Sequence, residues 1–434
     1  MRLSEGRLRT KTFSNFMARI VLSTLGSLGD LNPKIALAIE LKRRGHEVVL
    51  NTWEGYREKS ESLGFEFSPL RPDIDPTDKE LTKKAMDART GPEMVIREIV
   101  FPHLREMYDD IAAACQSADL LINGELIYVA GSLAEKTGIK WITTSLQPLS
   151  MFSSTDPNVY PTAEFLEYLR PLPAFFHENL FSFMKWTIRD WFEPFKQFRR
   201  DLGLSDTVDP VFVDKYSKTL HLAMFSRAIA KPQADWFSPT LQTGFCFYDE
   251  SNSIALEPKL EAFLKNSEPP IVFTLGSAAV LDARDFFDES VKAAKLLGRR
   301  AVLIYGSEND PPKGLDDNIV GFPFAPYSLV FPYAACVVHQ GGIGTTSQVL
   351  RAGKPHVFIP FSHDQPDNAA RCRRAGVAEI IRREQYHAAT ASRILKEILA
   401  DPKYLSTASE LKRIVNSESG TVTACDAIED ILRK

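Results

Sequence analysis

Short runs of consecutive apolar residues alternate along the chain with longer segments of helical periodicity. In the first half these runs lie at Ala18–Ser23, Glu47–Asn51, Asp119–Asn123 and Lys140–Ser145. In the second half they lie at Pro269–Ser277, Ala301–Tyr305, Ala335–His339 and His356–Pro360. Continuous apolar strands separated by helices are typical of parallel sheets that are covered on both faces. The pattern therefore predicts an α/β fold with two doubly wound parallel-sheet domains.

Two segments interrupt the alternation. Residues 151–205 are crowded with Phe, Trp, Tyr and Pro, which predicts helices that line or cover something apolar. The polar, aperiodic stretch 248–258 predicts a linker. We therefore expect an N-terminal domain over residues 17–247, which includes the aromatic region, and a C-terminal domain over residues 259–434. Residues 1–16 are basic and lack the apolar core of a secretory signal, so we expect a disordered tail; an upstream start site and a transit peptide are the alternatives.

The composition narrows the class of protein. The chain has 434 residues, of which 44% are hydrophobic and 25% charged, and its formal net charge of -4 gives no indication of nucleic-acid binding. Its five cysteines are scattered and form no C-x-x-C pair, which favours reduced thiols in the cytoplasm over disulfides or a zinc site. No apolar run approaches the ~18 residues of a membrane span. We expect a cytoplasmic protein with at most peripheral membrane contact.

A glycine-rich turn near the C-terminus carries the strongest chemical signal. A predicted strand ends at His339, and "GGIGTT" then opens a helix. Backbone N–H groups at such a helix N-terminus bind phosphate, and hydroxyls add further donors. A histidine at the strand end can donate to a phosphate oxygen. A nicotinamide-type fingerprint or a plain tight turn is the alternative, but the turn lies deep in the chain and follows a histidine.

The next predicted strand is followed by Asp364-Gln365. Ligands of open α/β sheets bind at the carboxyl ends of the strands. His339, the glycine turn and Asp364-Gln365 are therefore expected to converge on one ligand. Its phosphate groups would meet the turn, and its hydroxyls the acid–amide pair.

A second loop of interest, "LGSLGDLNP", follows the first predicted strand. Asn32 and Pro33 predict a helix start, with Asn32 as the N-cap and Pro33 in the first turn. Asp30 then lies between strand and helix, beside Gly26 and Gly29. It is not needed as a cap, so its position calls for another explanation.

These motifs together resemble the GT-B glycosyltransferases of family 1. "HQGGIGTT" and "HDQPDN" are similar to the donor-binding signature of that family. "GSLGDLNP", "TGFCFYD" and "FTLGS" occur in the family's order and spacing. The resemblance is closest to the rhamnolipid rhamnosyltransferases, the glycopeptide-antibiotic glycosyltransferases and the sterol glucosyltransferases. It implies two Rossmann-like domains that face a cleft, with the acceptor in the first and the donor in the second.

The resemblance implies that Asp30 is the general base on the acceptor hydroxyl, within the pattern G-x-x-G-D-x-x-P. Gly29 and Glu125 are expected on the acceptor side, and Glu125 could equally be plain solvent-exposed surface. A carboxylate near the hydroxyl contributes typically 10²–10⁴-fold to the rate. A helix N-terminus would weaken Asp30 as a base, so positioning and an apolar surround must compensate. The other interpretation of Asp30 is a helix cap.

The resemblance also implies the donor contacts. Ser277 would reach the diphosphate, and Phe324 would stack on the base, with Ala325 pairing to it; a core position is the alternative for Phe324. The phosphates would be held by His339, Gly342, Gly344 and Thr345, and the sugar by Asp364 and Gln365. Where plant members carry a ribose-binding Glu, this chain has Ser347, which is compatible with a deoxythymidine donor. No metal and no cofactor are implied.

We therefore expect an inverting, metal-independent glycosyltransferase. It would move a hexose from a UDP- or dTDP-sugar to a hydroxyl of a lipophilic small molecule. Two alternatives stay open at this point. The first is a GT-B nucleotide-sugar epimerase, and the second is a non-catalytic protein that binds a sugar nucleotide or a lipid.

Overall fold

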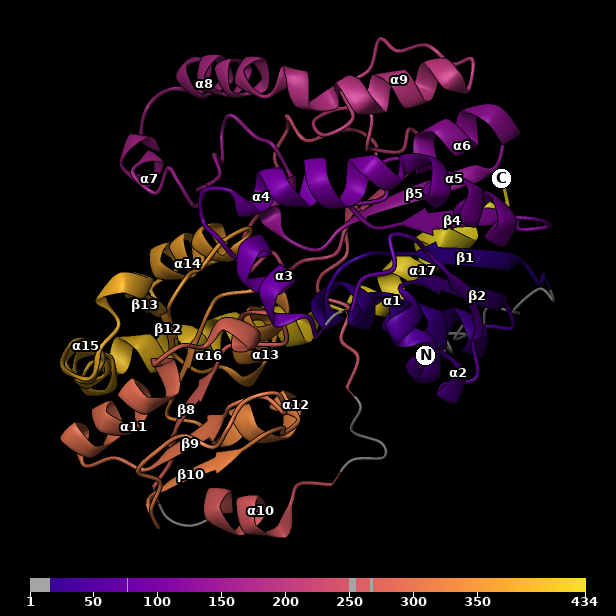
Figure 1. The fold of residues 1–434 in the computed structure, drawn as a ribbon. Helices are drawn as coiled ribbons and strands as arrows, with labels where there is room; N and C mark the ends of the chain where they lie inside the picture. The colour runs from indigo at the N-terminus through magenta and orange to yellow at the C-terminus, as the bar shows by residue number, and fades with distance from the viewer. Residues whose placement is uncertain (1–15, 76, 250–254, 266–267) are drawn as a thin grey trace, which may run out of the picture.

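The computed structural model describes residues 16–75, 77–249, 255–265 and 268–434. The predicted tail lies outside these ranges apart from Phe16, and so do residues 250–254 of the predicted linker. The described chain forms two parallel sheets with helices packed around each (Figure 1). The predicted fold class is confirmed.

The first sheet has seven strands. Their order across the sheet is β3 (Glu66–Pro69), β2 (Glu47–Thr52), β1 (Arg19–Ser23), β4 (Leu120–Asn123), β5 (Lys140–Ser145), β6 (His221–Ala223) and β7 (Thr240–Gln242). The central strand β1 pairs with β2 and β4, with Val21 opposite Val49 and Leu121. The four strands predicted in this half all form, with ends that differ by no more than one residue.

The second sheet has six strands. Their order is β10 (Ile319–Phe322), β9 (Ala301–Ile304), β8 (Ile271–Thr274), β11 (Cys336–His339), β12 (His356–Phe358) and β13 (Ala378–Ile380). In both sheets the order reverses beside the first strand, β1 or β8. Ligands of open α/β folds bind at such a reversal, at the carboxyl ends of the strands.

Helices cover both faces of each sheet. In the first domain they are α1 (Leu28–Arg43), α2 (Arg57–Ser62), α3 (Lys79–Ala85), α4 (Gly91–Met94), α5 (Leu104–Ala114), α6 (Ala130–Thr137), α7 (Leu166–Leu169), α8 (Ala174–Thr187) and α9 (Glu193–Asp201). Alternate side chains of β1 enter different cores. Ile20 packs with α1, whereas Val21 packs with α5 and α9 on the opposite face.

The second domain is built in the same way. Its helices are α10 (Pro258–Lys265), α11 (Phe286–Leu297), α12 (Tyr327–Val330), α13 (Ile343–Ala352), α14 (Gln365–Arg374), α15 (Ala388–Ala400) and α16 (Pro402–Ser417), and α17 (Gly420–Leu432) follows. Phe273 of β8 packs on one face with α11 and α15, and Val272 packs on the other with α10 and α12. Within the described residues no helix is long and apolar enough to cross a membrane.

The start of α1 differs from the prediction. The helix begins at Leu28 with Ser27 as its N-cap, so the prediction of Asn32 as the cap is wrong. Ser27 and Asp30 form a reciprocal capping box, which satisfies two N–H groups of the chain at the helix start. Pro33 lies inside the helix, and because proline has no N–H, the carbonyl of Gly29 lacks its usual helical donor. Asp30 therefore belongs to the first helical turn.

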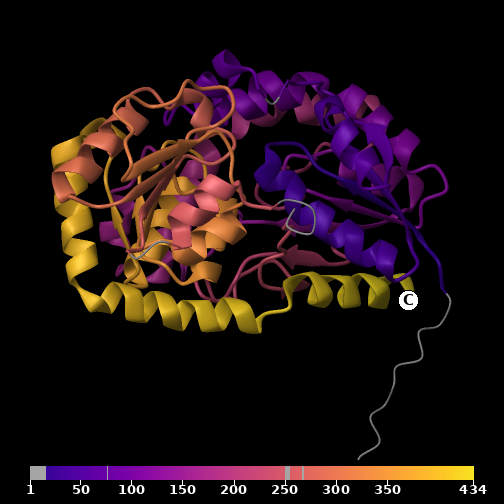
Figure 2. The same ribbon diagram turned by 90° about the horizontal axis from the view of Figure 1, so that it is seen from below.

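The last helix returns to the first domain. Figure 2 shows α16 and α17 running along the underside of both domains. Residues Ala424, Cys425 and Ile428 of α17 join the core beneath α1. Arg44, just after α1, pairs with Asp426 at 2.7 Å. The stretch from Gly420 onward, which the sequence analysis assigned to the C-terminal domain, thus packs on the N-terminal one.

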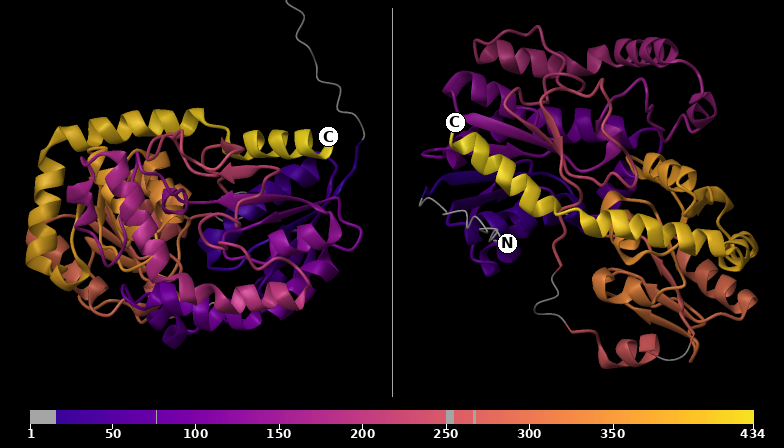
Figure 3. Two further views of the ribbon diagram at one scale, coloured as in Figure 1. Left: turned by 90° about the horizontal axis from the view of Figure 1, so that it is seen from above. Right: turned by 180° about the vertical axis from the view of Figure 1, so that it is seen from behind.

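The aromatic region 151–205 divides between core and surface. Phe152, Phe181, Phe192 and Phe195 pack in the core formed with α5 and α6. The outer faces of α7 and α8 instead expose large aromatic side chains, among them Tyr168, which is 84% exposed. Figure 3 shows α8 at the outer edge of the first domain, whereas α7 lies beside the second domain, where Glu167 pairs with Arg374 of α14 at 2.6 Å. The surplus of aromatic residues is therefore only in part core.

Candidate functional site

Asp30 uses its two carboxylate oxygens differently. The N–H of Ser27 donates to Oδ2 at 2.8 Å, and the hydroxyl of Ser27 lies 3.4 Å from the same oxygen. Oδ1 accepts no hydrogen bond from any residue that the structure describes. Gly26 lies against this carboxylate with φ +124°, and a Cβ at that position would be 2.3 Å from Oδ2. Gly26 and Ser27 together fix Asp30 and leave one oxygen for a ligand.

The surroundings of Asp30 favour its neutral form. Burial, reinforced by the negative charge of Glu125, raises the pKa of Asp30 to about 7. The hydrogen bonds from Ser27 and the charge of Lys34 act in the opposite direction. An acid of this pKa exchanges a proton readily at neutral pH, which is what a general base needs.

Glu125 follows strand β4 and is tied to the segment after β5. Its Oε1 accepts from the N–H of Leu146 at 3.1 Å, and its Oε2 accepts from the side chain of Gln147 at 3.2 Å. The hydroxyl of Ser150 donates to Oε2 as well. Glu125 is half-buried rather than fully exposed, and it links Asp30 electrostatically to the start of the aromatic region.

In the second domain, His339 ends β11 with a fully buried ring. Its Nδ1 accepts from the N–H of Gly341 at 3.1 Å, so its proton resides on Nε2, which lies 3.0 Å from Nδ1 of His356. Burial and the second imidazole hold the pKa of His339 well below its ordinary value. Both ring nitrogens are engaged, so the expected donation from His339 to a phosphate has no support in this geometry. The ring instead holds the glycine turn.

The turn leads into helix α13, whose N-cap is Gly342. Oδ2 of Asp364 accepts from the N–H of Ile343 at 3.0 Å and from the side chain of Asn368 at 2.7 Å. Burial is the main cause that raises the pKa of Asp364 to about 7, and the charge of Asp30 adds to it. Gly344 is exposed at this helix start, and Thr345 beside it is buried. The helix N-terminus, Gly344 and Asp364 therefore lie at one place, as the sequence analysis expected.

Gln365 lies beneath the end of α3 from the first domain. Its Oε1 accepts from the N–H of Phe361 at 2.7 Å, and its Nε2 lies 3.7 Å from the sulfur of Met86. His363 donates to the carbonyl of Ala85 at 2.8 Å. The segment after α3 thus covers the acid–amide pair, a feature that sequence reasoning missed because no local motif marks it.

The first turn of the second domain adjoins the glycine turn. A Cβ on Gly276, which has φ +69°, would lie 2.3 Å from Nε2 of Gln340 and 3.2 Å from the hydroxyl of Thr345. Ser277 is exposed directly after it. Ser277 and Thr345 therefore lie close to one edge of the sheet.

The segment between β10 and α12 reaches the same edge. The hydroxyl of Tyr327 lies 2.8 Å from that of Thr274, at the end of β8. Phe324 is 57% exposed, which excludes the core position left open for it, whereas Ala325 is buried. The exposed ring of Phe324, three residues before Tyr327, is free to stack on a flat ligand.

The two halves of the site meet at their helix N-termini. A Cβ on Gly344 of α13 would lie 3.7 Å from Cα of Gly29 of α1. Asp30 and Asp364 are close enough for the charge of one to raise the pKa of the other. The structure therefore brings the predicted acceptor-side residues and the predicted phosphate-binding turn together, although they are more than 300 residues apart in the sequence.

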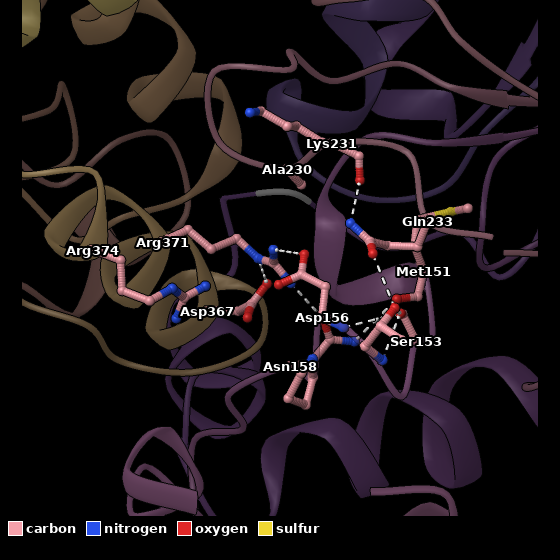
Figure 4. A network of polar contacts seen from close by, with 12 residues as sticks. Met151, Ser153, Asp156, Asn158, Ala230, Lys231, Gln233, Asp367, Arg371 and Arg374 are labelled. Atoms are coloured by element: carbon pink, nitrogen blue, oxygen red, sulfur yellow. Dashed lines mark hydrogen bonds and ion pairs between the residues drawn. The ribbon is translucent and has the colours of Figure 1, made fainter. Parts of the chain in front are cut away.

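An ion-pair network, which we call the clasp, joins the domains beside this site. It consists of Asp156 and Asn158 of the first domain and Asp367 and Arg371 of α14 (Figure 4). Arg371 donates to Asp367 at 2.7 Å, to Asn158 at 2.9 Å and to Asp156. The N–H of Val159 donates to Asp367 at 3.0 Å. Because α14 begins at Gln365, the clasp fixes this helix, and with it the acid–amide pair at its start, to the first domain.

Comparisons with known proteins agree with this two-domain site. The family model described as "Glycosyltransferase family 28 N-terminal domain" matches residues 20–150. The model described as "Erythromycin biosynthesis protein CIII-like, C-terminal domain" matches residues 302–424. The chain is 31% identical over 427 residues to O-mycaminosyltylonolide 6-deoxyallosyltransferase of Streptomyces fradiae, covering 95% of this chain and 97% of that protein. The chain belongs to the GT-B glycosyltransferases of family 1.

Further relatives show the breadth of the family. Sterol 3-beta-glucosyltransferase UGT80B1 of Arabidopsis thaliana is 24% identical, over 94% of this chain and 67% of that protein. Among solved structures, the glycotransferase of kitacinnamycin has a TM-score of 0.70 at 21% identity, covering 96% of this chain and 100% of that one. SsfS6 of Streptomyces sp. SF2575, complexed with thymidine diphosphate, has a TM-score of 0.63 at 18% identity and covers 95% and 99%. These structures show the GT-B fold, and the protein is a nucleotide-sugar glycosyltransferase.

Within this glycosyltransferase, two site residues escaped the sequence analysis. Ser27 was not recognised as an N-cap because Gly29 follows it in the first turn and because the Asn32-Pro33 pair is the more typical helix start. Lys34 carried a signal, since it is a charged residue at a position flanked by Leu31, Ile35 and Leu37 on the buried side of α1. Segments that reach the site only through tertiary packing, such as the end of α3, have no sequence motif that could have predicted their place.

Proposed function

We propose that this glycosyltransferase moves a hexose, with inversion, from a UDP- or dTDP-sugar to a hydroxyl of a lipophilic small molecule. Asp30 is the general base that takes the proton of the acceptor hydroxyl. The attacking oxygen forms its bond to the anomeric carbon as the bond to the nucleoside diphosphate breaks. No feature of the described residues favours the alternatives, an epimerase or a non-catalytic binding protein.

The observation that carries the proposal is the free Oδ1 of Asp30 opposite the N-terminus of α13. The oxygen belongs to a carboxyl with a pKa of about 7, and its partner oxygen is fixed by Ser27. A positioned base whose pKa lies near the working pH is the efficient case for proton transfer. The acceptor would bind between Asp30 and the donor's anomeric carbon.

The donor's diphosphate would bind to the glycine turn. The N-terminus of α13, with the exposed Gly344, presents backbone N–H groups and the positive end of the helix dipole. Hydroxyls of Thr345 and Ser277 lie nearby. Oriented donors of this kind stabilise the charge that develops on a leaving diphosphate. His339 would act indirectly, because its ring holds the N–H of Gly341.

The nucleoside and the sugar would occupy the two sides of this turn. Phe324 is exposed and would stack on the base, and Asp364 with Gln365 would bind the sugar hydroxyls. The hydroxyl of Ser347 donates to the carbonyl of Gly344 at 2.8 Å and is committed to its own helix. A donor without a 2'-hydroxyl suits such a site, and the relative SsfS6 was solved with thymidine diphosphate. We therefore favour a dTDP-sugar over a UDP-sugar.

The acceptor would be bulky and apolar. By their names, two relatives act on O-mycaminosyltylonolide and on a sterol, which supports a lipophilic acceptor for this chain. Phe152 and Phe181 stack at 4.8 Å in a cluster with Phe212, and Lys215 lies 5.1 Å above Phe152. The negative charge of Glu125 acts on Lys215, which supports an acceptor site beside this aromatic cluster.

A turnover assay tests the proposal. Release of dTDP and UDP is measured with each sugar nucleotide, in the presence of macrolide aglycones, sterols and simple alcohols, and the products are weighed by mass spectrometry. We expect a gain of one hexose on a lipophilic alcohol, with dTDP-sugars the better donors. Conversion of the donor in the absence of any acceptor would support the epimerase instead. Tight nucleotide binding without release of any product would support the non-catalytic alternative.

A further inference from the structure

A lysine is completely buried one helical turn after Asp30. Lys34 is 0% exposed, and its Nζ donates to the hydroxyl of Thr144. That hydroxyl in turn donates to the carbonyl of Asn123 at 2.9 Å. Nζ has no other hydrogen-bond partner among the described residues, although an ammonium carries three donors. Two N–H bonds of a buried cation are therefore left for electrostatic interaction with nearby charges.

The residues around Nζ of Lys34 show which charged groups are near it. Asn123 and Thr144 lie at the carboxyl ends of β4 and β5, the edge at which the acceptor is expected. Asp30 stands four residues before Lys34, and residues at this spacing are neighbours on one helix face. Glu125 follows β4 by two residues. Both carboxylates act on Lys34, and burial, the largest effect, lowers its pKa to about 8.

Such a lysine is costly in a protein core. A buried charge destabilises the fold unless it is paired, and an apolar side chain would fill the same space without that cost. The hydroxyl of Thr144 alone does not compensate an ammonium. The compensation that remains is attraction to Asp30 and Glu125, whose two negative charges repel each other across the site.

Resting on the proposed function, we infer that Lys34 is a positioning residue of the same site: its buried ammonium keeps the carboxylate of Asp30 charged between two other acids. Without it, the charged neighbours of Asp30 are the acids Glu125 and Asp364, and at neutral pH a smaller fraction of Asp30 is ionised and able to take the proton of the acceptor. Lys34 acts through Asp30 and touches neither substrate.

The other titratable groups around this pair are few. Groups that interact with Asp30 are Tyr56, Glu125 and Asp364. Groups that interact with Lys34 are Glu125, His221 and Cys246. Burial lowers the pKa of His221 to about 3, raises that of Cys246 to about 12 and raises that of Tyr56 well above its usual value. The pKa values of Asp30 and Asp364 are about 7 and that of Lys34 is about 8, so these three groups change charge between pH 5 and 9.

The test is the pH profile of kcat/KM for Lys34→Met, a change that keeps an unbranched side chain of similar shape and removes its charge. Loss of a nearby opposite charge raises the pKa of an acid by about one unit or more. We expect the acidic limb of the profile to move upward, so that the variant is about tenfold slower than the wild type at pH 6. At pH 9 the two enzymes should differ by less than about twofold, because Asp30 is then ionised in both.

Two controls separate this role from a structural one. Lys42→Met on the outer side of the same helix should leave the profile unmoved. Thr144→Val removes the hydroxyl that accepts from Nζ and should shift the acidic limb in the same direction as Lys34→Met. It replaces Lys34→Met in the test if that variant does not fold. A loss of activity that is equal at every pH would overturn the proposal, and so would an unchanged acidic limb in a folded Lys34→Met.

The outcome can be told apart from failure of the proposed function. If Asp30→Asn abolishes transfer while Lys34→Met keeps the wild-type profile, the base stands and only the role of Lys34 falls. If Asp30→Asn is fully active, both fall. Melting temperature in the presence of dTDP reports on the second domain, and we expect the ligand-induced increase to be the same in Lys34→Met and the wild type.

Discussion

Ser27 and Asp30 cap helix α1 reciprocally, and the cap occupies one carboxylate oxygen only. The hydroxyl of Ser27 accepts from the N–H of Gly29 at 3.1 Å, while Oδ2 of Asp30 accepts from the N–H of Ser27 at 2.8 Å. The two interpretations of Asp30, helix cap and base, are therefore compatible. The capping box fixes the carboxylate in place, and the second oxygen accepts no hydrogen bond from the described residues, so it can bind a ligand while the cap stays intact.

The first prediction concerns Asp30→Asn. The amide oxygen can still accept from Ser27, so the helix should keep its start, but the variant has no basic form. We expect kcat to fall by about 10² or more with nearly unchanged affinity for the donor nucleotide. Steady-state kinetics and nucleotide titration measure the two effects. Asp401→Asn is the matched control, because Asp401 caps α16 by accepting from Lys403 at 2.9 Å; it should keep full activity. Wild-type kcat in Asp30→Asn would rule out the base.

The second prediction concerns the close approach of Gly26 to Asp30. Alanine at position 26 would place a Cβ 2.3 Å from Oδ2 and would push the carboxylate aside. A displacement of about 1 Å can cost on the order of 10² in rate, so we expect kcat to fall at least tenfold. Gly45→Ala is the control, since Gly45 also has a positive φ, +95°, but has no atom within 4 Å of its would-be Cβ. It should lower the melting temperature and leave kcat alone. Equal kinetics of the two variants would contradict the geometry.

The third prediction concerns the clasp. The side chain of Arg371 is 2% exposed, and Asp367 is completely buried. Arg371→Met leaves the buried Asp367 without its cation, although Asp156 keeps its pair with Arg170, so the free energy of unfolding should fall by about 3–5 kcal/mol. Arg374→Met removes a pair with Glu167 at the surface and should cost about 0–1 kcal/mol. Chemical denaturation measures both. Similar losses in the two variants would mean that the network does not join the domains as described.

The fourth prediction concerns the pH dependence of stability. The pKa of Asp364 is about 7 in the folded protein and about 3.9 in an unfolded chain. Between these values the folded state binds more protons, so the stability contributed by Asp364 is present below pH 4 and is lost as the pH rises through 7. Asp364→Asn does not titrate. The free energy of unfolding of the wild type should therefore fall relative to that of Asp364→Asn as the pH rises from 4 to 7. The relative change should be up to about 1.4 kcal/mol for each unit between the two pKa values.

The control for this prediction is a carboxyl group whose pKa is lowered in the folded protein. Backbone hydrogen bonding lowers the pKa of Asp316, so its contribution is present above pH 4 and is lost only below it. The difference between Asp316→Asn and the wild type should accordingly be flat from pH 4 to 7. A flat difference for Asp364→Asn over the same range would show that its carboxyl is not buried as described.

The sequence predicted the strands well, because buried parallel strands such as Val337–His339 are unbroken apolar runs. It also predicted that the glycine turn and Asp364 lie together, because both follow strands of one sheet, whereas the approach of Asp30 to them was implied only by the resemblance to the family. It misplaced the start of α1, since Asn32-Pro33 imitates a helix start more plainly than Ser27 and Asp30 do. The roles of Lys34, Arg371 and the end of α3 could not be predicted, because they depend on contacts between distant segments. The same holds for the buried ring of His339, because its partner His356 lies on the neighbouring strand β12.

The most direct test of the account is the anomeric configuration of the product. A dTDP-α-hexose is supplied with a lipophilic alcohol, and the product is followed by NMR from the start of the reaction. Direct attack by a hydroxyl that Asp30 deprotonates predicts the β-anomer as the first product formed, with one dTDP released for each molecule transferred. The Asp30→Asn variant should bind dTDP and form about 10²-fold less of this product in the same time. An α-linked product, or equal product formation by the variant, would contradict the account.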